Sequence, residues 1–572
     1  MTAIRLRRWQ RTAFDRFTAL DDENPNFLAV ATPGAGKTTF ALTCARWSLA
    51  QERRRLIVVA PTSHLKAQWS LAAHRLGLQL DPDWTPTGGI AKDVHGIVTT
   101  FQQVATGDTA NVLKGISNDA FVILDELHHA GDEKAWGDAV RLAFANAHRR
   151  LCLSGTPFRS DTASIPFVRY DDGQAFADYE YGYGDALRDG GVVRPVYFPR
   201  VDGHMEWSAP DGAVLSASFQ DELGRDGVSQ RLRAALSLDG EWLPHVIEQA
   251  HERLTYLRDS HPQAGGLVIA MDQEHAHGIA RLMRSRFAVK ADVVVSDDPG
   301  ASKKISAFAE SDEPWLVSVR MVSEGVDIPR LRVGVYASTV STELFFRQAV
   351  GRFVRWQTGH VSQKAFVYLP DDMRLRTHAF QIMESRRHVL RRFQPGDDET
   401  VVETGIAERD APLDEIQEEL GPEQLSLFSV LSAVATGMQI HAITPSGVAI
   451  PFEMGTDEMD LPEATHYDDE SEFADLEGDA DLDLDLAEIP TDAGWAPQSG
   501  RSVFEIKAAL RESNANLAKR LVDITGWSHA RVNGEMNRLG TVVAVSSATT
   551  DQLERRLRKS EEWLAQLRRR RP

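Results

Sequence analysis

The chain contains only two cysteines, Cys44 and Cys152, among its 572 residues. Two thiols cannot build a framework of several disulfides or a zinc site of four cysteines, so both kinds of stabilised domain are excluded. No apolar run approaches the roughly 18 residues that a membrane span needs. The basic start, MTAIRLRRWQ, leads into no apolar signal-peptide core. We therefore expect a cytoplasmic protein without a membrane partner.

Positive charge is nearly absent from one region of the chain. Residues 401–500 hold 25 acidic residues and a single basic residue, Arg409, although the net charge of the whole chain is only −20. Residues 501–572, by contrast, hold 15 basic and 8 acidic residues. The acidity is regional, so it does not argue against a nucleic-acid partner.

Short apolar runs separated by helix-length segments recur in two parts of the chain. FLAVA, LIVVAP and FVILDE come before residue 160, and GLVIAM, PWLVSV and AFVYLP come after residue 260. Short, continuously apolar runs with this separation are typical of buried strands in a parallel sheet. We predict an α/β fold with two tandem parallel-sheet domains, an acidic linker and a small α-helical C-terminal domain.

The stretch ATPGAGKTTF (31–40) follows a predicted strand and precedes a predicted helix, the context of a phosphate-binding loop. Glycines let backbone N–H groups point at phosphate oxygens, Lys37 reaches the β and γ phosphates, and Thr38 supplies a Mg²⁺ ligand. Ala31 stands where the general pattern has glycine, and a plain glycine-rich turn is the alternative. The predicted nucleotide-binding residues of this loop are Thr32, Gly34, Ala35, Gly36, Lys37, Thr38 and Thr39.

Two adjacent acids end another predicted strand in VILDELHH (122–129). Phosphoryl transfer needs one carboxylate near Mg²⁺ and another group that orients the attacking water. We assign these roles to Asp125 and Glu126, with Thr38 and Asp125 as the metal-binding residues. An acidic pair after a strand is common, but its place about 90 residues after a phosphate loop makes the assignment specific.

These motifs belong to an ordered series that resembles superfamily 2 helicases and translocases. LRRWQ resembles an adenine-reading box, which implies a base contact for Gln10. APTSHLKAQW (60–69) and TTFQQVA (99–105) resemble boxes that grip a strand backbone. SGTPFR resembles the box that couples ATP state to nucleic-acid grip, through Ser154 and Thr156.

The series continues in the second predicted unit and covers roughly residues 1–392. MVSEGVDIP resembles the box that bridges ATP and the nucleic acid, in which Gly325 and Asp327 are the defining residues. QAVGRFVR matches a box that begins at Gln348 and implies that Arg352 and Arg355 act as arginine fingers. The resemblance implies two RecA-like domains and the cofactors ATP and Mg²⁺. The expected regions are 1–161, RecA-like domain 1; 162–245, a connector with a small sheet of its own; 246–394, RecA-like domain 2; 395–500, an acidic linker; and 501–572, a basic helical domain.

Details of the boxes favour DNA over RNA. The chain has DELH in place of DEAD, and it has Gln348 where RNA-directed DEAD-box proteins usually have histidine. Both features resemble those of the motors of DNA repair, recombination and restriction. His128 would then link the ATP site to the second unit, whereas His129 is expected to be structural. The resemblance implies an ATP-dependent DNA helicase or double-strand translocase. An RNA-directed helicase, or an ATP-switched motor subunit of a defence or restriction assembly, remains the alternative.

The basic C-terminal region resembles a helix–turn–helix over residues 515–540, with Gly526 in the turn and Ser528 as helix cap. Arg531, Asn533, Asn537 and Arg538 would stay available to read DNA. A helical bundle that docks on protein is the equal alternative. FEIK (504–507) superficially resembles a nuclease motif, but no upstream acid on a strand supports that reading.

Within the acidic linker, QLSLF resembles the pentapeptide that tethers bacterial proteins to the DNA sliding clamp. Gln424 offers an amide, and Leu425, Leu427 and Phe428 are apolar anchors for a pocket. The alternative is a short amphipathic helix that continues through SVLSAVA and packs on the second α/β unit. A bacterial sliding clamp is therefore a possible partner beside nucleic acid.

Overall fold

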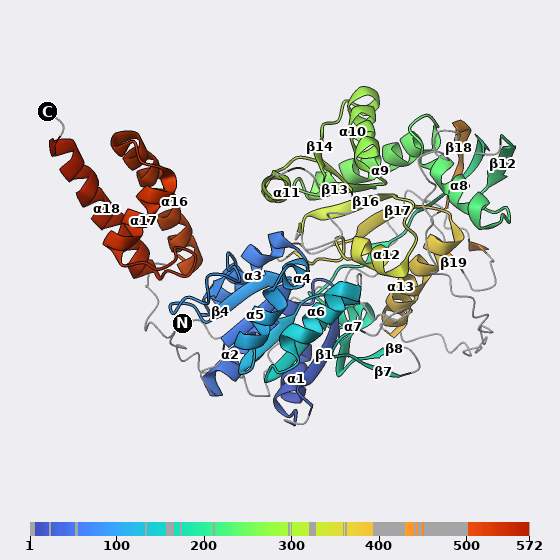
Figure 1. The fold of residues 1–572 in the computed structure, drawn as a ribbon. Helices are drawn as coiled ribbons and strands as arrows, with labels where there is room; N and C mark the ends of the chain where they lie inside the picture. The colour runs from blue at the N-terminus through green and yellow to red at the C-terminus, as the bar shows by residue number, and fades with distance from the viewer. Residues whose placement is uncertain are drawn as a thin grey trace. The chain divides into compact units, whose positions relative to one another are not determined.

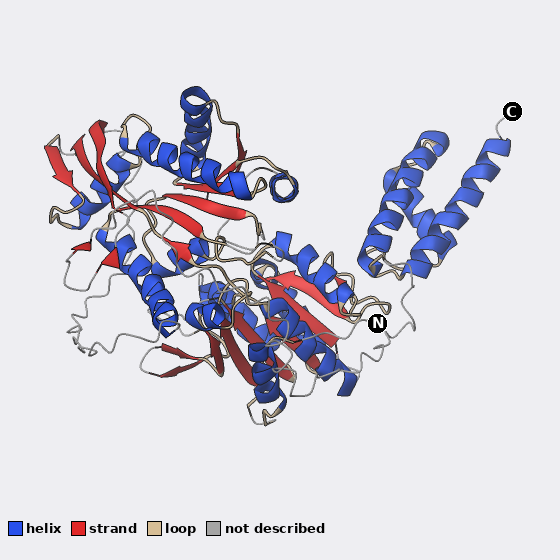
Figure 2. Cartoon of the chain, turned by 180° about the vertical axis from the view of Figure 1, so that it is seen from behind, coloured by secondary structure: helices blue, strands red, loops and turns tan. Residues whose placement is uncertain are grey.

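The computed structural model describes residues 6–21, 24–51, 55–131, 134–155, 165–171, 174–209, 212–295, 298, 300–319, 328–357, 360, 363–392, 429–439, 442–443, 449–450 and 501–570. The chain divides into two compact units. Unit 1 comprises residues 1–31, 36–180 and 480–572, and unit 2 comprises residues 32–35 and 181–479. Strands and helices of both units are distinguished in Figure 2. No helix of the described part is long and apolar enough to cross a membrane.

Unit 1 contains a seven-stranded sheet in the order β3-β4-β2-β5-β6-β1-β9. The pairs from β3 to β1 are parallel, and the strands that bear the predicted apolar runs are buried. The strands are β1 (Asn26–Ala31), β2 (Arg55–Ala60), β3 (Leu80–Asp81), β4 (Gly96–Thr100), β5 (Ala120–Leu124), β6 (Arg149–Ser154) and β9 (Tyr179–Tyr181). The helical segments are α1 (Arg8–Thr18), α2 (Lys37–Gln51), α3 (Ser63–Arg75), α4 (Phe101–Ala105), α5 (Thr109–Ile116), η1 (Leu127–Gly131) and α6 (Lys134–Phe144) (Figure 1).

Unit 2 is built on a second sheet, whose main path is β12-β11-β17-β16-β13-β15-β14. Its strands are β10 (Val196–Tyr197), β11 (Arg200–Ser208), β12 (Val214–Ser218), β13 (Gly265–Ala270), β14 (Ala291–Val294), β15 (Trp315–Val319), β16 (Leu331–Ala337), β17 (Ala365–Pro370) and β18 (Ser429–Gln439). The helices are α7 (Tyr183–Arg188), α8 (Arg225–Ala235), α9 (Trp242–Ser260), α10 (Gln273–Phe287), α11 (Ala301–Glu310), α12 (Glu343–Val350) and α13 (Met373–Arg392). From β11 to β14 the pairs are parallel, which confirms the predicted pair of α/β parallel-sheet domains.

The region predicted as a connector contributes to three sheets. Among its described residues, β7 (Arg169–Asp171) and β8 (Gln174–Phe176) form a separate two-stranded sheet. Strand β9 joins the sheet of unit 1, whereas β11 and β12 extend the sheet of unit 2. Buried Met205 and Trp207 on β11 belong to the main core of unit 2, so this region is integral to its packing.

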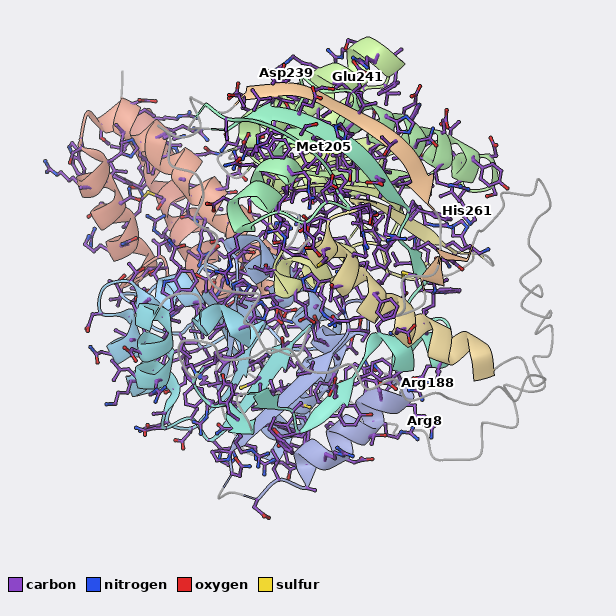
Figure 3. The ribbon with its side chains drawn as sticks, turned by 90° about the vertical axis from the view of Figure 1, so that its right-hand side faces the viewer. Arg8, Arg188, Met205, Asp239, Glu241 and His261 are labelled. Carbon is purple, nitrogen blue, oxygen red and sulfur yellow. The ribbon has the colours of Figure 1, made fainter. Side chains whose placement is uncertain are left out.

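The segment SVLSAVA is a strand, and its predicted alternative as a helix is wrong. It forms the first part of β18, which runs antiparallel to β11 from Ser429 opposite Ser208 to Gln439 opposite Arg200. Figure 3 shows this strand beside β11, on which Met205 is labelled. β-branched residues favour strands, and β11 offers a row of backbone partners that a helix would leave unused. Two short strands follow, β19 (Ala442–Ile443) and β20 (Ala449–Ile450).

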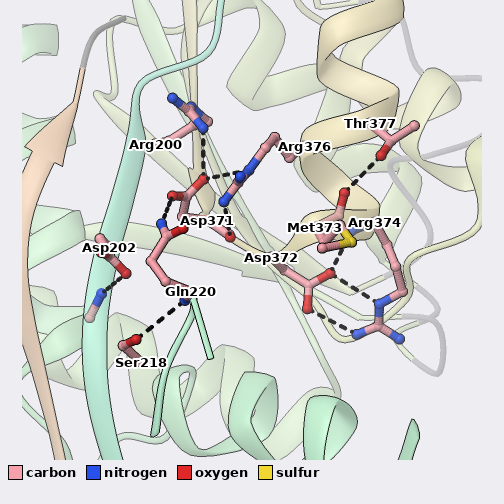
Figure 4. Close-up of polar contacts among 11 residues, drawn as sticks. Arg200, Asp202, Ser218, Gln220, Asp371, Asp372, Met373, Arg374, Arg376 and Thr377 are labelled. Carbon is pink, nitrogen blue, oxygen red and sulfur yellow. Dashed lines mark hydrogen bonds and ion pairs between the residues drawn. The ribbon is translucent and has the colours of Figure 1, made fainter. Parts of the chain in front are cut away.

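A buried polar network joins β11, β17 and the start of α13 (Figure 4). Asp371, just after β17, accepts hydrogen bonds from Arg200 (3.0 Å), Arg376 (3.1 Å) and the amide of Gln220 (3.0 Å). Burial raises the pKa of Asp371, although the two arginines oppose the rise. Because an unpaired buried charge is costly, these contacts favour one register of the connector strand against the second domain.

The C-terminal helices form a bundle that docks on the α/β part of unit 1. They are α16 (Val503–Thr525), α17 (His529–Gly540) and α18 (Thr550–Arg570), around a core that includes Leu521, Met536 and Leu564. The predicted helical C-terminal domain is confirmed, as are the turn at Gly526 (φ 69°) and the cap at Ser528.

A buried carboxylate makes one of the docking contacts. Asp93 accepts hydrogen bonds from Lys507 Nζ at 2.6 Å and from the Thr550 backbone N–H at 2.9 Å. The starts of α16 and α18 are thereby fixed to the same group in the loop before β4. Val503 packs with Val94 in a small apolar cluster at this contact.

Candidate nucleotide site

The predicted phosphate-binding loop is a tight turn between β1 and α2. Gly34 and Gly36 have φ values of 82° and 94°, in the region where only glycine lacks a steric penalty. A side chain at Gly36 would also lie 2.8 Å from the amide nitrogen of Gln10. Helix α2 begins at Lys37, so its N-terminal N–H groups face the turn, as anion binding requires.

Gln10 supports this loop from α1. Its Nε2 donates to the Gly36 carbonyl at 3.0 Å, and its Oε1 accepts from the Arg7 N–H at 2.8 Å. The side chain is buried, and both ends of the amide are engaged. The structure therefore places Gln10 against the phosphate loop, where its predicted adenine contact remains a proposal.

Lys37 and Glu126 meet at the carboxyl end of the sheet. The Lys37 Nζ lies 3.0 Å from Glu126 Oε1 and donates to the Ala31 carbonyl at 3.2 Å. Glu126 follows β5 with a φ of 48° and accepts a 2.9 Å hydrogen bond from the Gly155 N–H. A Cβ at position 155 would come within 2.9 Å of Lys37 Nζ, which explains a glycine there.

Asp125 is held beside this pair by α3. Its backbone N–H donates to the Val59 carbonyl at 2.9 Å, and its Oδ2 accepts a 2.8 Å hydrogen bond from Trp69 Nε1. Both side chains are buried. The predicted acids therefore lie at adjacent positions with different partners.

The two acids differ in proton affinity. Burial raises the pKa of Asp125 to about 6, and the neighbouring charge of Glu126 adds to the rise. Burial also acts on Glu126, but the Lys37 ammonium, with His128, outweighs it and lowers the pKa of Glu126 to about 2. Glu126 is therefore anionic at neutral pH, the form that can accept a hydrogen bond from water.

His128 and Ser154 complete the described site. Ser154 ends β6, and its Oγ lies 3.4 Å from His128 Nδ1, which is 3.6 Å from Glu126 Oε2. Of the predicted coupling residues, His128 thus lies next to Glu126, and Ser154 contacts His128. Thr156, also predicted, lies outside the described residues. His129 is buried and its ring contacts those of Phe101 and His128; its structural role stays a prediction.

Oxygen donors suited to Mg²⁺ are present in unit 1. Magnesium in phosphate-transfer sites takes one or two protein carboxylates or hydroxyls and completes its shell with phosphates and water. The carboxylate of Asp125 and the hydroxyl of Thr38 fit this donor set. The described residues include no group of three or more His, Cys, Asp or Glu that could hold an ion by themselves.

In unit 2, the predicted finger residues follow α12, which carries Gln348. The connector fixes this segment: the Arg194 N–H donates to the Val354 carbonyl at 2.7 Å, and Val193 bridges Arg355. The fully buried Arg194 guanidinium also donates to the Pro329 and Leu331 carbonyls, at 2.7 and 3.1 Å.

The arginine box, which includes Arg352, is thus tied to the last residue of the bridging box and to the chain just after it. Sequence reasoning missed Arg194, since nothing in VVRP signals these contacts. Gly325 and Asp327 of the bridging box lie outside the described residues, as do Gln424, Leu425, Leu427 and Phe428 of the clamp motif.

The polar face of α17 is used inside the bundle. Arg556 donates to Asn533, Asn537 and Asn514 at 2.8, 2.7 and 2.7 Å. The expectation that Asn533 and Asn537 stay available to read DNA is therefore wrong, because a buried guanidinium recruits both amides. Arg538 pairs with Glu535, and Arg531 lies over the Trp527 ring at 4.0 Å.

The nuclease-like FEIK has a structural role. Glu505 forms a capping box with Ser502 at the start of α16. Lys507 is buried against Asp93. Neither side chain is placed as a nuclease motif would need.

Comparison with known proteins agrees with the series of boxes. Residues 3–159 match the family model of the type III restriction enzyme res subunit. "Uncharacterized protein Rv2917" of Mycobacterium tuberculosis is 45% identical over 394 residues, which are 68% of this chain and 65% of the relative. The chain thus matches just under two thirds of that relative's length.

Two more distant likenesses have names that state an activity or an assembly. The ATP-dependent DNA helicase MPH1 of Scheffersomyces stipitis is 30% identical over 146 residues, 23% of this chain and 14% of that protein. A fragment assigned as the HsdR subunit of a type I restriction enzyme from Vibrio vulnificus is 17% identical, with a TM-score of 0.45 over 65% of each chain. Residues 3–159 thus resemble the res subunit of type III restriction enzymes, and the ordered boxes over residues 1–392 resemble those of superfamily 2 helicases.

Proposed function

We propose that this chain is a nucleic-acid-stimulated ATPase that moves on DNA, as a helicase or a double-strand translocase. The observation that carries the proposal is the 3.0 Å contact between Lys37 and Glu126 beside a glycine turn at the N-terminus of α2. A cation, an acid and a row of backbone N–H groups are thus gathered where a triphosphate would bind.

The residues of unit 1 divide the chemistry of hydrolysis. Lys37 and the loop amides bind and orient the phosphates, and Glu126 accepts a hydrogen bond from the attacking water. The Lys37 ammonium, with His128 and the Gly155 N–H at 2.9 Å, keeps Glu126 anionic. When bound, Mg²⁺ supplies charge neutralisation of the phosphates, and Thr38 and Asp125 would hold it. Gln10 would position the base.

The residues of unit 2 would make hydrolysis depend on domain closure. Arg352 and Arg355 stand in the box whose arginines neutralise transition-state charge in related motors. Gly325 and Asp327 stand in the box that bridges ATP and nucleic acid, and Gln348 precedes the arginines. ATP binding and hydrolysis would then alternate the grip on a strand, without reading its sequence.

DNA is favoured as the track by the kind of motor that the chain resembles. The matched family model is that of a restriction enzyme subunit, and the relative MPH1 bears the name of a DNA helicase. The chain's own DELH box and Gln348 point the same way. The second candidate is a motor subunit of a restriction or defence assembly, which the family match also favours.

The test is the rate of ATP hydrolysis by the full chain with single-stranded DNA, duplex DNA, forked DNA and RNA. We expect Mg²⁺-dependent hydrolysis that DNA stimulates more than RNA. Glu126→Gln is the matched inactive control, because it keeps the size of the side chain. Equal rates with and without every nucleic acid would contradict the proposed motor, and stimulation by RNA alone would contradict the choice of DNA.

A further inference from the structure

Trp69 makes a polar contact that packing alone does not require. It lies on α3, which starts at Ser63 within the APTSHLKAQW stretch and ends at Arg75. Its side chain is 2% exposed, and its Nε1 donates to Asp125 Oδ2 at 2.8 Å. The two residues are 56 positions apart in the sequence, so the contact depends on the tertiary fold.

A second buried tryptophan in the same unit provides a comparison. Trp84 is also 2% exposed, but its indole N–H has no hydrogen-bond partner among the described residues. The fold therefore accommodates a buried indole without a partner. At position 69 the N–H is instead directed at the carboxylate that would hold the metal.

The contact restrains the carboxylate that would hold the metal. The backbone N–H of Asp125 is bound by the Val59 carbonyl, and Oδ2 is bound by the indole. The main chain and the side chain of Asp125 are thus both held, which limits the directions that the carboxylate can take. Groups that orient a ligand in this way tune metal affinity without touching the ion.

We propose that Trp69 is a positioning residue for Asp125, through which α3 and the metal site move together. The proposal rests on the proposed ATPase function and deepens it. Because α3 belongs to a box that resembles strand-gripping elements, a shift of this helix on nucleic-acid binding would alter the direction of the Asp125 carboxylate. Trp69 would thus couple binding of the strand to the orientation of the metal-binding carboxylate.

Trp69→Phe isolates the hydrogen bond, since it retains an aromatic ring but removes the donor. Trp84→Phe is the matched control, since it removes an indole N–H that bonds nothing in the described structure. The readout is Mn²⁺ binding in the presence of ADP, measured by electron paramagnetic resonance, which requires no turnover. We expect Trp69→Phe to bind Mn²⁺ about 10-fold more weakly than the wild type, and Trp84→Phe to match the wild type.

Equal Mn²⁺ affinities for the two variants would overturn the role of Trp69. If the wild type itself binds no Mn²⁺ with ADP, the proposed function fails instead, so the two failures are distinguishable. If Trp69→Phe does not fold, ¹⁵N spectra of the tryptophan indoles of the wild type test the role of Trp69 instead. Trp84→Phe assigns the Trp84 signal, and a folded Asp125→Asn variant assigns that of Trp69. Addition of Mg²⁺ and ADP should shift the Trp69 signal and leave that of Trp84 in place, and an unmoved Trp69 signal would refute the proposal.

Discussion

At the scale of single residues, Lys37 and Glu126 contact each other but should fail in different ways when changed. Lys37→Ala removes the ammonium that would bind phosphate, so ATP binding should weaken. Glu126→Gln keeps the shape but not the charge, so ATP should bind while hydrolysis falls by about 10²–10⁴-fold. Binding of a fluorescent ATP analogue, together with steady-state phosphate release, separates the two effects. Near-native hydrolysis by Glu126→Gln would show that another group orients the water.

Arg352 and Arg355 provide a second prediction. Alanine at either position should leave ATP binding intact and reduce nucleic-acid-stimulated hydrolysis by roughly 10³–10⁵-fold, the range of an arginine finger. The same binding and phosphate-release assays measure both quantities. Loss of ATP binding, or a lower unfolding temperature, would indicate that these arginines stabilise unit 2 instead.

Part of the candidate site was accessible from sequence because its residues belong to short local patterns. Lys37 follows two glycines, and Asp125 and Glu126 end an apolar strand, so spacing alone identified them. Trp69 and Arg194 were missed as site residues for a physical reason. Their partners lie 56 and at least 135 positions away, where only the folded sheets bring them together.

At the scale of elements, one buried carboxylate contributes to the docking of α16 and α18. Removing one partner of a buried ion pair leaves a charge without compensation and costs about 3–5 kcal/mol. Lys507→Ala should therefore lower the free energy of unfolding by about that amount, because Asp93 would keep only the Thr550 N–H. Urea denaturation measures the change, and exposed Lys519→Ala is the control. Equal stabilities of the two variants would mean that the bundle docks by other contacts.

Helices and strands were predictable where the apolar periodicity was strong. The predictions failed where a neighbouring strand or helix determined the structure. The buried strands and the C-terminal helices followed from apolar spacing. Residues 429–435 were weighed as a helix, yet they form a strand because β11 presents unpaired backbone groups to them. Likewise, the side chains of α17 gave no sign that Arg556, on another helix, would bind Asn533 and Asn537.

At the scale of the whole molecule, the acidic region separates residues 1–400, whose net charge is −3, from the basic residues 501–572, and it carries QLSLF directly before β18. The prediction is that a peptide of residues 420–432 binds a bacterial sliding clamp with micromolar affinity, about −8 kcal/mol. Such weak binding would raise the local concentration of the motor on DNA. Fluorescence anisotropy measures the affinity. The control peptide carries Leu427→Ala and Phe428→Ala. Equal signals from the two peptides would contradict the predicted binding to a sliding clamp.

We expect ATP hydrolysis at the Lys37–Glu126 site to drive movement along DNA. Displacement of a labelled third strand from a duplex measures this movement, with the full chain and its Glu126→Gln variant compared side by side. Displacement should require ATP and Mg²⁺ and be absent from the variant. Hydrolysis of ATP on the same duplex without displacement of the third strand would contradict the expected movement.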